Sequence, residues 1–267
     1  MQTVRLLYIQ RTKMKSDFWT KIEKNVRDFF SQQGFTCDSC DGEVFEYPHR
    51  RLCAECEEKL IHTGENFCPK FGRKKVADGV CTDCKKNLPK FTRGFSPFVY
   101  RGHAAALINR MKNGNPHLAY YFGEQMAEDF AEKHLKNVDK SEELLLVPVP
   151  LYKTKRIERG YNQAERLAES ICVRLQALGY SARVETELLQ KRRETAQQKQ
   201  MTYVERMDNV SGAYHVHKRK ECKGKTILLI DDILTTGATS SECAARLFGA
   251  GAKEVYFLVA ASLEERK

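Results

Sequence analysis

Two adjacent carboxylates, Asp231 and Asp232, stand between an apolar run and a cluster of hydroxyls in the segment TILLIDDILTTGATSSE. Backbone amides and hydroxyls at the start of a helix suit a phosphate monoester, and a glycine lets the backbone approach it closely. The carboxylates need a different partner, which a ribose diol or a magnesium ion bridged to a pyrophosphate supplies. The segment therefore predicts a sugar-phosphate site. The residues expected to hold the phosphate are Thr235, Thr236, Gly237, Ala238 and Thr239.

Other phosphate-binding patterns do not fit this segment. It lacks the G-x-x-x-x-G-K of a Walker loop and the G-x-G-x-x-G of a dinucleotide site. An acidic pair also marks receiver domains, but there it follows an early strand and not the penultimate one. The simplest alternative is a strand-to-helix turn with an aspartate cap and no ligand.

Closely paired cysteines form the second group with chemistry. Seven of the ten cysteines fall between residues 37 and 84, and in the reducing interior of a cell such pairs indicate metal binding instead of disulfides. Two C-x-x-C pairs separated by twelve residues have the spacing of a structural zinc site with no open coordination position. The expected zinc ligands are Cys37, Cys40, Cys53 and Cys56.

Composition bounds the class of protein. The 267 residues are 42% hydrophobic and 30% charged, as in a soluble globular protein. No run reaches the ~18 apolar residues of a membrane span, and VRLLYI near the N-terminus is too short for a signal peptide. We therefore expect a cytoplasmic protein. The net charge of +10 indicates a phosphate-rich small molecule or a nucleic acid as ligand, with a merely basic surface as the alternative.

Strand-like and helix-like segments alternate in the second half of the chain. LLLVPVP, ARVETELL, KTILLI and EVYFLVAAS read as strands, and helices are expected at NQAERLAESICVRLQALG and SSECAARLFGAG. Two further helices are expected between residues 98 and 135, broken near NGNPH. This pattern predicts an α/β fold with a parallel sheet flanked by helices. An amphipathic helix over residues 16–31 is expected to dock on the protein's own core.

The segment ILLIDDILTTGAT resembles the 5-phosphoribosyl-1-pyrophosphate (PRPP) motif of type I phosphoribosyltransferases. Together with VPVPLYKTKRIERGYNQAERLA and the cysteine pairs, it makes residues 37–262 similar to the ComF family of competence proteins. The resemblance implies an N-terminal extension (1–34), a zinc-ribbon module (35–92) and a phosphoribosyltransferase-like domain (93–267). It also implies that Asp231 and Asp232 bind the ribose hydroxyls with Mg²⁺.

The resemblance further implies two basic segments around the ligand. In type I enzymes the segment after the first strand of the domain faces the pyrophosphate, and a mobile loop closes over PRPP. Residues 190–210 correspond to that loop, and Arg193, Thr195 and Gln198 match the family's R-x-T-x-x-Q pattern. For the basic segment, a solvated loop without a ligand is the alternative. Its candidate pyrophosphate contacts are Lys153, Lys155, Arg156 and Arg159.

A second set of cysteines departs from the family's pattern. Cys68, Cys81 and Cys84 supply only three thiolates, because Phe71 stands where the family's CPxCG knuckle has a cysteine. Either this site has lost its metal, or a neighbour such as His62 or Asp83 completes a second zinc site.

Two functional classes stay open. One is a binding protein of DNA uptake in natural transformation, which the resemblance implies, with single-stranded DNA and the uptake helicase machinery as partners. The 17 Lys and Arg against 9 Asp and Glu between residues 146 and 225 favour such a polyanion. The other is an active phosphoribosyltransferase of nucleotide metabolism, whose acceptor the sequence does not name.

Overall fold

The structure is a computed structural model whose residues fall into two compact units, Met1–Glu57 and Glu58–Lys267. The helix expected over residues 16–31 lies outside the described residues. Among the helices of the described part of the chain, none has the length and apolar character needed to cross a membrane. The structure describes residues 36–44, 51–75, 79–135, 140, 142–195 and 203–265.

In the first unit, a tight turn carries the first pair of cysteines. The amide of Cys37 donates to the carbonyl of Gly42 at 2.6 Å, and the amide of Asp41 donates back to the carbonyl of Cys37 at 2.9 Å. Thr36 and Glu43 form a β-bridge that closes the turn. The second pair of cysteines lies at the start of helix α2 (Ala54–Glu58).

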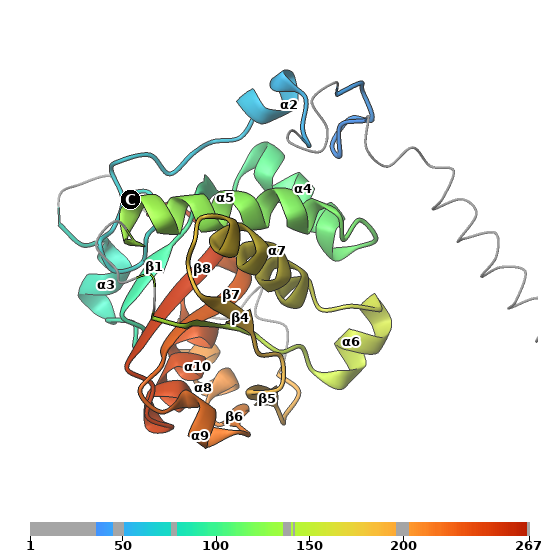
Figure 1. Ribbon diagram of the computed structural model, residues 1–267. Helices are drawn as coiled ribbons and strands as arrows, with labels where there is room; N and C mark the ends of the chain where they lie inside the picture. The colour runs from blue at the N-terminus through green and yellow to red at the C-terminus, as the bar shows by residue number, and fades with distance from the viewer. Residues whose placement is uncertain are drawn as a thin grey trace, which may run out of the picture. The chain divides into compact units, whose positions relative to one another are not determined.

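A parallel sheet forms the centre of the second unit, as the alternating sequence pattern predicts (Figure 1). Its strand order is β1-β8-β7-β3-β4, and β2 also pairs with β8. β3 and most of β7 and β8 are buried, because both faces of the sheet are covered. The strands are β1 (Arg93–Phe95), β2 (Phe98–Val99), β3 (Leu144–Pro148), β4 (Ala182–Val184), β7 (Thr226–Leu234) and β8 (Glu254–Ser262).

Helices cover the two faces of this sheet (Figure 1). One layer contains α4 (Gly102–Lys112), α5 (Leu118–Lys133) and α7 (Gln163–Ala177), and the other contains α10 (Ala238–Gly249). The break between α4 and α5 falls at NGNPH, as expected. At the start of α7 the side chain of Asn162 accepts a hydrogen bond from the amide of Ala164 at 3.0 Å, a cap worth about 1 kcal/mol.

A small antiparallel ladder stands beside the main sheet. β5 (Leu189–Lys191) pairs with β6 (Tyr214–Val216), and helix α8 (Tyr203–Val210) lies in the chain between them. α9 (Arg219–Cys222) follows β6 and leads into β7. The segment that resembles the mobile loop (residues 190–210) therefore starts on β5 and ends with α8, shortly before β6.

The described residues between 58 and 92 pack with the sheet and do not form a separate body. Cys68, Phe71 and Phe91 belong to the same apolar core as Leu229 of β7 and Ala244 of α10. The contacts divide the chain after Glu57, and the module boundary at residue 92 that the resemblance implies stays a prediction. Helix α3 (Thr82–Lys86) lies within this integrated segment.

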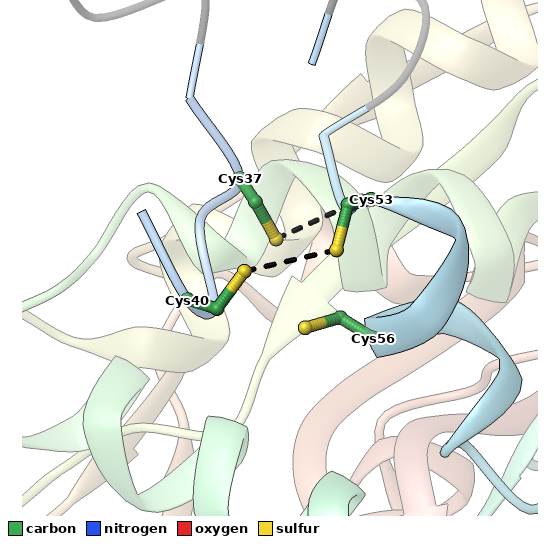
Figure 2. A group of neighbouring side chains, drawn as sticks. All are labelled: Cys37, Cys40, Cys53 and Cys56. Carbon is green, nitrogen blue, oxygen red and sulfur yellow. Dashed lines mark hydrogen bonds between the residues drawn. The ribbon is translucent and has the colours of Figure 1, made fainter. Parts of the chain in front are cut away.

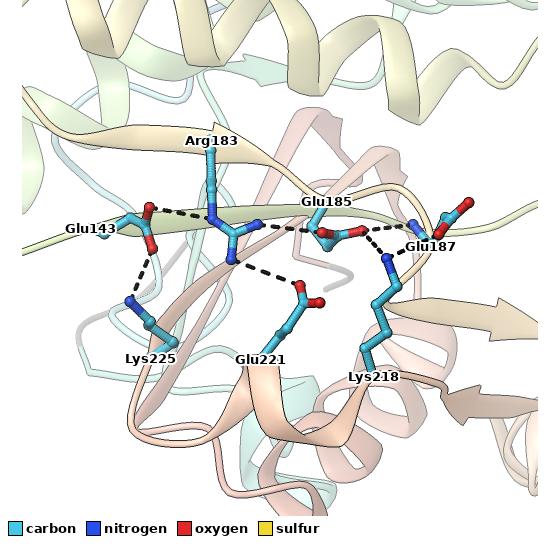
Figure 3. A network of polar contacts seen from close by, with 7 residues as sticks. All are labelled: Glu143, Arg183, Glu185, Glu187, Lys218, Glu221 and Lys225. Carbon is cyan, nitrogen blue, oxygen red and sulfur yellow. Dashed lines mark hydrogen bonds and ion pairs between the residues drawn. The ribbon is translucent and has the colours of Figure 1, made fainter.

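A network of ion pairs lies where the central strands begin (Figure 3). Arg183 of β4 contacts Glu143, which precedes β3, at 3.3 Å, and it contacts Glu221 of α9 at 3.8 Å. Lys225, which precedes β7, pairs with Glu143 at 2.9 Å. Since the strands are parallel, this network marks the edge opposite to Asp231 and Asp232.

Candidate functional site

The acidic pair lies at the carboxyl edge of the sheet, where ligands of open α/β sheets bind. β3 ends opposite Ile230, so Asp231 and Asp232 extend past it while β7 continues to pair with β8. Asp232 is buried, and its Oδ1 forms a 3.0 Å ion pair with Nζ of Lys112 at the end of α4. Its Oδ2 is buried without a hydrogen-bond partner in the described residues, which leaves one acceptor for a ligand.

Burial changes the protonation of the other aspartate. It raises the pKa of Asp231 to about 7, and the charge of Asp232 acts in the same direction. Lys112 and Lys191 oppose this rise in the pKa through their positive charges. Burial in turn lowers the pKa of Lys191. Asp231 therefore changes charge near neutral pH, under the influence of a second carboxylate and two lysines.

The turn that follows has the geometry expected of a phosphate cradle. Gly237 is the N-cap of α10 with a φ of 79°, a conformation that favours glycine. Oγ1 of Thr236 is buried and has no hydrogen-bond partner among the described residues. The positive end of the twelve-residue α10 faces the same turn. The structure thus brings the acids and the residues from Thr235 to Thr239 together on one strand-turn-helix unit.

The segment that resembles the mobile loop reaches this turn. Nη1 of Arg206 in α8 donates to Oγ1 of Thr235 at 3.4 Å. Arg193 does not contact the turn, and its Nη2 instead donates to the carbonyls of Asn209 and Ser211, both at 2.9 Å. Oγ1 of Thr195 accepts from Nζ of Lys191 at 2.7 Å. Gln198 lies outside the described residues.

The basic segment after β3 is a helix, α6 (Lys153–Arg159), and not the loop that the sequence suggested. The segment lacks an apolar stripe, since none of its residues is buried, so periodicity could not reveal it. Arg156 pairs with Glu165 at 2.8 Å, Lys155 pairs with Glu158 at 2.7 Å, and Arg159 donates to Gln163. These contacts hold the basic side chains on the surface.

The first cysteine cluster (Cys37, Cys40, Cys53 and Cys56) fits a zinc ion (Figure 2). Its four sulfurs lie within 4.8 Å of one another, and those of Cys40 and Cys53 are 3.7 Å apart. Zn–S bonds of about 2.3 Å place sulfurs about 3.8 Å apart at the corners of a tetrahedron. The amide of Cys53 also donates to Sγ of Cys37 at 3.2 Å, as befits a thiolate.

The second cysteine cluster (Cys68, Cys81 and Cys84) is compact and buried. Its three sulfurs lie within 4.8 Å of one another, and those of Cys68 and Cys84 are 3.6 Å apart. Hydrogen bonds from the other two thiols lower the pKa of Cys68. The donor set suits a thiolate-binding metal, so both clusters of this chain could hold zinc.

Neither of the two residues considered as a fourth ligand joins the second cluster. Oδ2 of Asp83 is held by Nη1 of Arg73 at 2.5 Å. The ring of His62 packs on Phe98 with 4.8 Å between the centroids. Among the described residues, the metal-binding group therefore consists of the three cysteines alone.

Four basic residues of the site escaped the sequence interpretation. Lys112 and Arg73 lie more than a hundred residues from the aspartates, and no local pattern marks them. Lys191 and Arg206 fall inside the stretch that resembles the mobile loop, but the family pattern does not include them. Only the folded chain shows that all four positive charges converge on residues 231–235.

Comparison with known proteins agrees with this architecture. The family described as "Phosphoribosyl transferase domain" matches residues 158–267. Competence protein ComFC of Streptococcus pneumoniae is 30% identical over 209 residues, which cover 76% of this chain and 84% of the relative. This chain belongs to the ComF family of competence proteins. The relative of the same name in Bacillus subtilis is 28% identical, over 72% of this chain and 75% of its own.

Other ComF relatives carry a different description. "DNA utilization protein YhgH" of Escherichia coli K12 is 23% identical, over 79% of this chain and 90% of the relative. Among solved structures, a hypoxanthine-guanine phosphoribosyltransferase of Schistosoma mansoni in complex with IMP aligns at 14% identity with a TM-score of 0.31. That alignment covers 56% of this chain and 66% of the enzyme. The ComF assignment rests on the sequence relatives and the parallel sheet.

Proposed function

We propose that this ComF-family protein binds PRPP with Mg²⁺ at the carboxyl edge of β7 and acts in DNA uptake. One observation supports the choice of ligand. Two buried oxygens of the same strand-turn-helix unit, Oδ2 of Asp232 and Oγ1 of Thr236, have no hydrogen-bond partner among the described residues. Leaving a buried polar atom unpaired costs about 1–3 kcal/mol, so a ligand that pairs both is favoured. A 5-phosphorylated ribose offers hydroxyls to the acid and phosphate oxygens to the threonine.

The pyrophosphate of PRPP adds charge that the surrounding lysines and arginines match. Mg²⁺ prefers one or two carboxylates together with substrate phosphates, and Asp231 and Asp232 supply such carboxylates. Lys112 forms an ion pair with Asp232 and offsets its charge. α6 carries Arg156 and Arg159, whose planar guanidinium groups suit phosphate oxygens.

The exposed face of α6 also supports single-stranded DNA as a partner. Its basic side chains are surface residues on a helix without any buried position. Ile157 on the same helix is 82% exposed and offers apolar contact beside these charges. Basic residues around an exposed apolar side chain fit a nucleic-acid strand, whose backbone and bases differ in polarity. The uptake helicase machinery is a further partner of the proposed role in transformation.

A second function, phosphoribosyl transfer to an acceptor, is favoured by the pKa of Asp231. A carboxyl that titrates at about 7 is suited to proton transfer at neutral pH. In this reaction the acceptor forms a bond to C1 of the ribose and loses its proton, while the bond to pyrophosphate breaks. No pocket for the acceptor is assigned among the described residues. We therefore place PRPP binding without transfer ahead of transferase activity.

Calorimetry with PRPP and Mg²⁺ tests the proposed function. We expect binding by the wild type and at least about tenfold weaker binding by Asp232→Asn, which removes the charge of the acid. Glu169→Gln, which changes an exposed carboxylate on α7 that pairs with Arg166, serves as the matched control and should bind like the wild type. A wild type without Mg²⁺-dependent affinity for PRPP would refute the proposal.

Two assays separate the two functions: one measures pyrophosphate release from PRPP, and the other measures binding of single-stranded DNA. Release of pyrophosphate from PRPP only in the presence of an acceptor would establish the transferase. Single-stranded DNA binding that falls as salt rises, and that weakens in a quadruple variant of the α6 basic residues, would support the uptake function.

A further inference from the structure

The second cysteine cluster sits in a knuckle with the same backbone as the first. In the first, the amide of Cys37 donates to the carbonyl five residues on, and the amide four residues on donates to the carbonyl of Cys37. In the second, Cys68 makes the same two bonds, with Arg73 at 2.8 Å and Gly72 at 2.7 Å. The bridges Thr36–Glu43 and Phe67–Lys74 also correspond.

This correspondence gives Phe71 a structural equivalent. It occupies the position of Cys40, a metal ligand candidate in the first knuckle, three residues after the first cysteine. The second knuckle has therefore kept its turn and exchanged a sulfur for an aromatic ring. The contacts of this ring indicate its role.

The ring of Phe71 packs on the turn of residues 235–239 that is proposed to hold the phosphate, called the phosphate turn below. A β-carbon built on Gly237 would lie 2.5 Å from Cε1 and 2.9 Å from Cζ of Phe71, so only glycine allows this approach. The ring also contacts Phe91, with 5.7 Å between the centroids, and Phe91 contacts Phe257 of β8 at 5.4 Å. Phe71 thus fills the space between the sheet core and the turn.

Arg73, the next side chain of the knuckle, holds the same turn by a hydrogen bond. It is fully buried, and its Nη2 donates to the carbonyl of Thr235 at 2.6 Å. Its Nη1 pairs with Asp83 of α3, and its guanidinium lies 4.4 Å from the centroid of the Phe71 ring. The knuckle is itself anchored to β1, since the amide of Gly94 donates to the carbonyl of Lys70 at 2.7 Å.

We propose that the second cysteine knuckle is a built-in support of the phosphate turn, with Phe71 and Arg73 as positioning residues for the 5′-phosphate of the ligand. This inference rests on the proposed function for the identity of the ligand. The carbonyl of Thr235 is fixed by Arg73, while its hydroxyl is contacted by Arg206 from α8. Cys68, Cys81 and Cys84, with or without a metal, hold the turn of the knuckle that presents both side chains.

Variants of Arg73 test the support directly. For Arg73→Met we expect about tenfold weaker binding of PRPP, because a charged hydrogen bond to the turn is lost, and faster amide hydrogen exchange at residues 235–239. Arg73→Lys retains a donor and a charge and should recover most of both properties. Arg174→Met, which removes a surface pair with Glu128, is the matched control and should change neither.

Phe71→Cys separates positioning from general stability. It restores the fourth thiolate of the knuckle, so retention of zinc against a chelator should rise, while PRPP binding should fall about tenfold because the ring is lost. If Phe71 acted only by stabilising the knuckle, the firmer metal binding of Phe71→Cys would instead raise the affinity for PRPP. If the wild type binds PRPP and both Phe71→Cys and Arg73→Met bind equally well, the support is refuted and the proposed function stands.

Hydrogen exchange decides the case in which PRPP is not the ligand. Unchanged exchange at residues 235–239 in Arg73→Met would then refute the support as well. Faster exchange there, recovered in Arg73→Lys, would uphold the support without the proposed ligand.

Discussion

A single side chain illustrates how the fold sets the chemistry of this site. Asp231 lies on β7 just past the end of the neighbouring strand β3, beside a second carboxylate. Burial and this neighbouring charge raise its pKa to about 7. Its ordinary pKa of 3.8 applies in the unfolded chain. The folded protein therefore binds more protons than the unfolded chain between about pH 4 and 7, and the free energy of unfolding falls as pH rises through this range.

Asp231→Asn should remove this loss of stability. We expect the variant to unfold with a free energy about 1–3 kcal/mol higher than the wild type at pH 8 and with nearly equal free energy at pH 4. Urea unfolding across this pH range measures the difference. Parallel pH profiles of the two proteins would contradict the prediction, and Asp208→Asn should follow the wild type. A stabilised variant that binds PRPP poorly would mark Asp231 as a functional residue.

At the scale of elements, hydrogen bonds join the two ends (the base) of the segment that resembles the mobile loop. Arg193 near its start donates to the carbonyls of Asn209 and Ser211 near its end. The amide of Gly212 then donates to the buried Glu242 of α10 at 2.9 Å. These bonds join the end of the segment to α10, whose N-terminus follows the turn of residues 235–237.

Arg193→Met should open this base without unfolding the sheet. Loss of the two hydrogen bonds should destabilise this junction by about 1–2 kcal/mol, seen as faster amide exchange in residues 205–211. Arg192→Met is the control, because its exposed side chain is changed while its backbone bond to Ala213 remains. Equal exchange in the two variants would show that Arg193 does not hold the base.

Elements with a clear apolar period were predictable, and contacts between distant residues were not. The buried strands and α7 follow from runs and stripes of apolar residues, and the acids with their turn follow from one contiguous motif. α6 was missed because all of its residues are solvent-accessible. The ion pair of Lys112 with Asp232 and the packing of Phe71 on Gly237 join segments whose proximity only the tertiary fold creates.

In the second unit as a whole, the charged groups at the two edges of the sheet differ in how well they are paired. At the carboxyl edge, Oδ2 of Asp232 and Oγ1 of Thr236 have no partner among the described residues and the pKa of Asp231 is raised, which weakens the free protein but suits a ligand. At the opposite edge, the network around Arg183 satisfies its carboxylates (Figure 3). The hydrogen bond from Lys225 lowers the pKa of Glu143 there. Stability and binding should therefore respond separately to mutation.

Arg183→Met tests this separation. It removes the ion pairs with Glu143, Glu185 and Glu221, and we expect a loss of about 1 kcal/mol in the free energy of unfolding with PRPP affinity unchanged. Because the pKa of Glu143 is lowered by folding, its contribution is present above the ordinary pKa and disappears as pH falls through the folded value.

The difference in the free energy of unfolding between Arg183→Met and the wild type should accordingly become smaller at pH 3. It should also become smaller in about 1 M salt, where screening weakens exposed ion pairs. Arg166→Met removes an isolated surface pair with Glu169 and should cost less than about 0.5 kcal/mol. Chemical unfolding and calorimetry with PRPP provide the two readouts. If Arg183→Met lowered PRPP affinity as strongly as Asp232→Asn does, the two edges would be coupled, and the network would belong to the binding site.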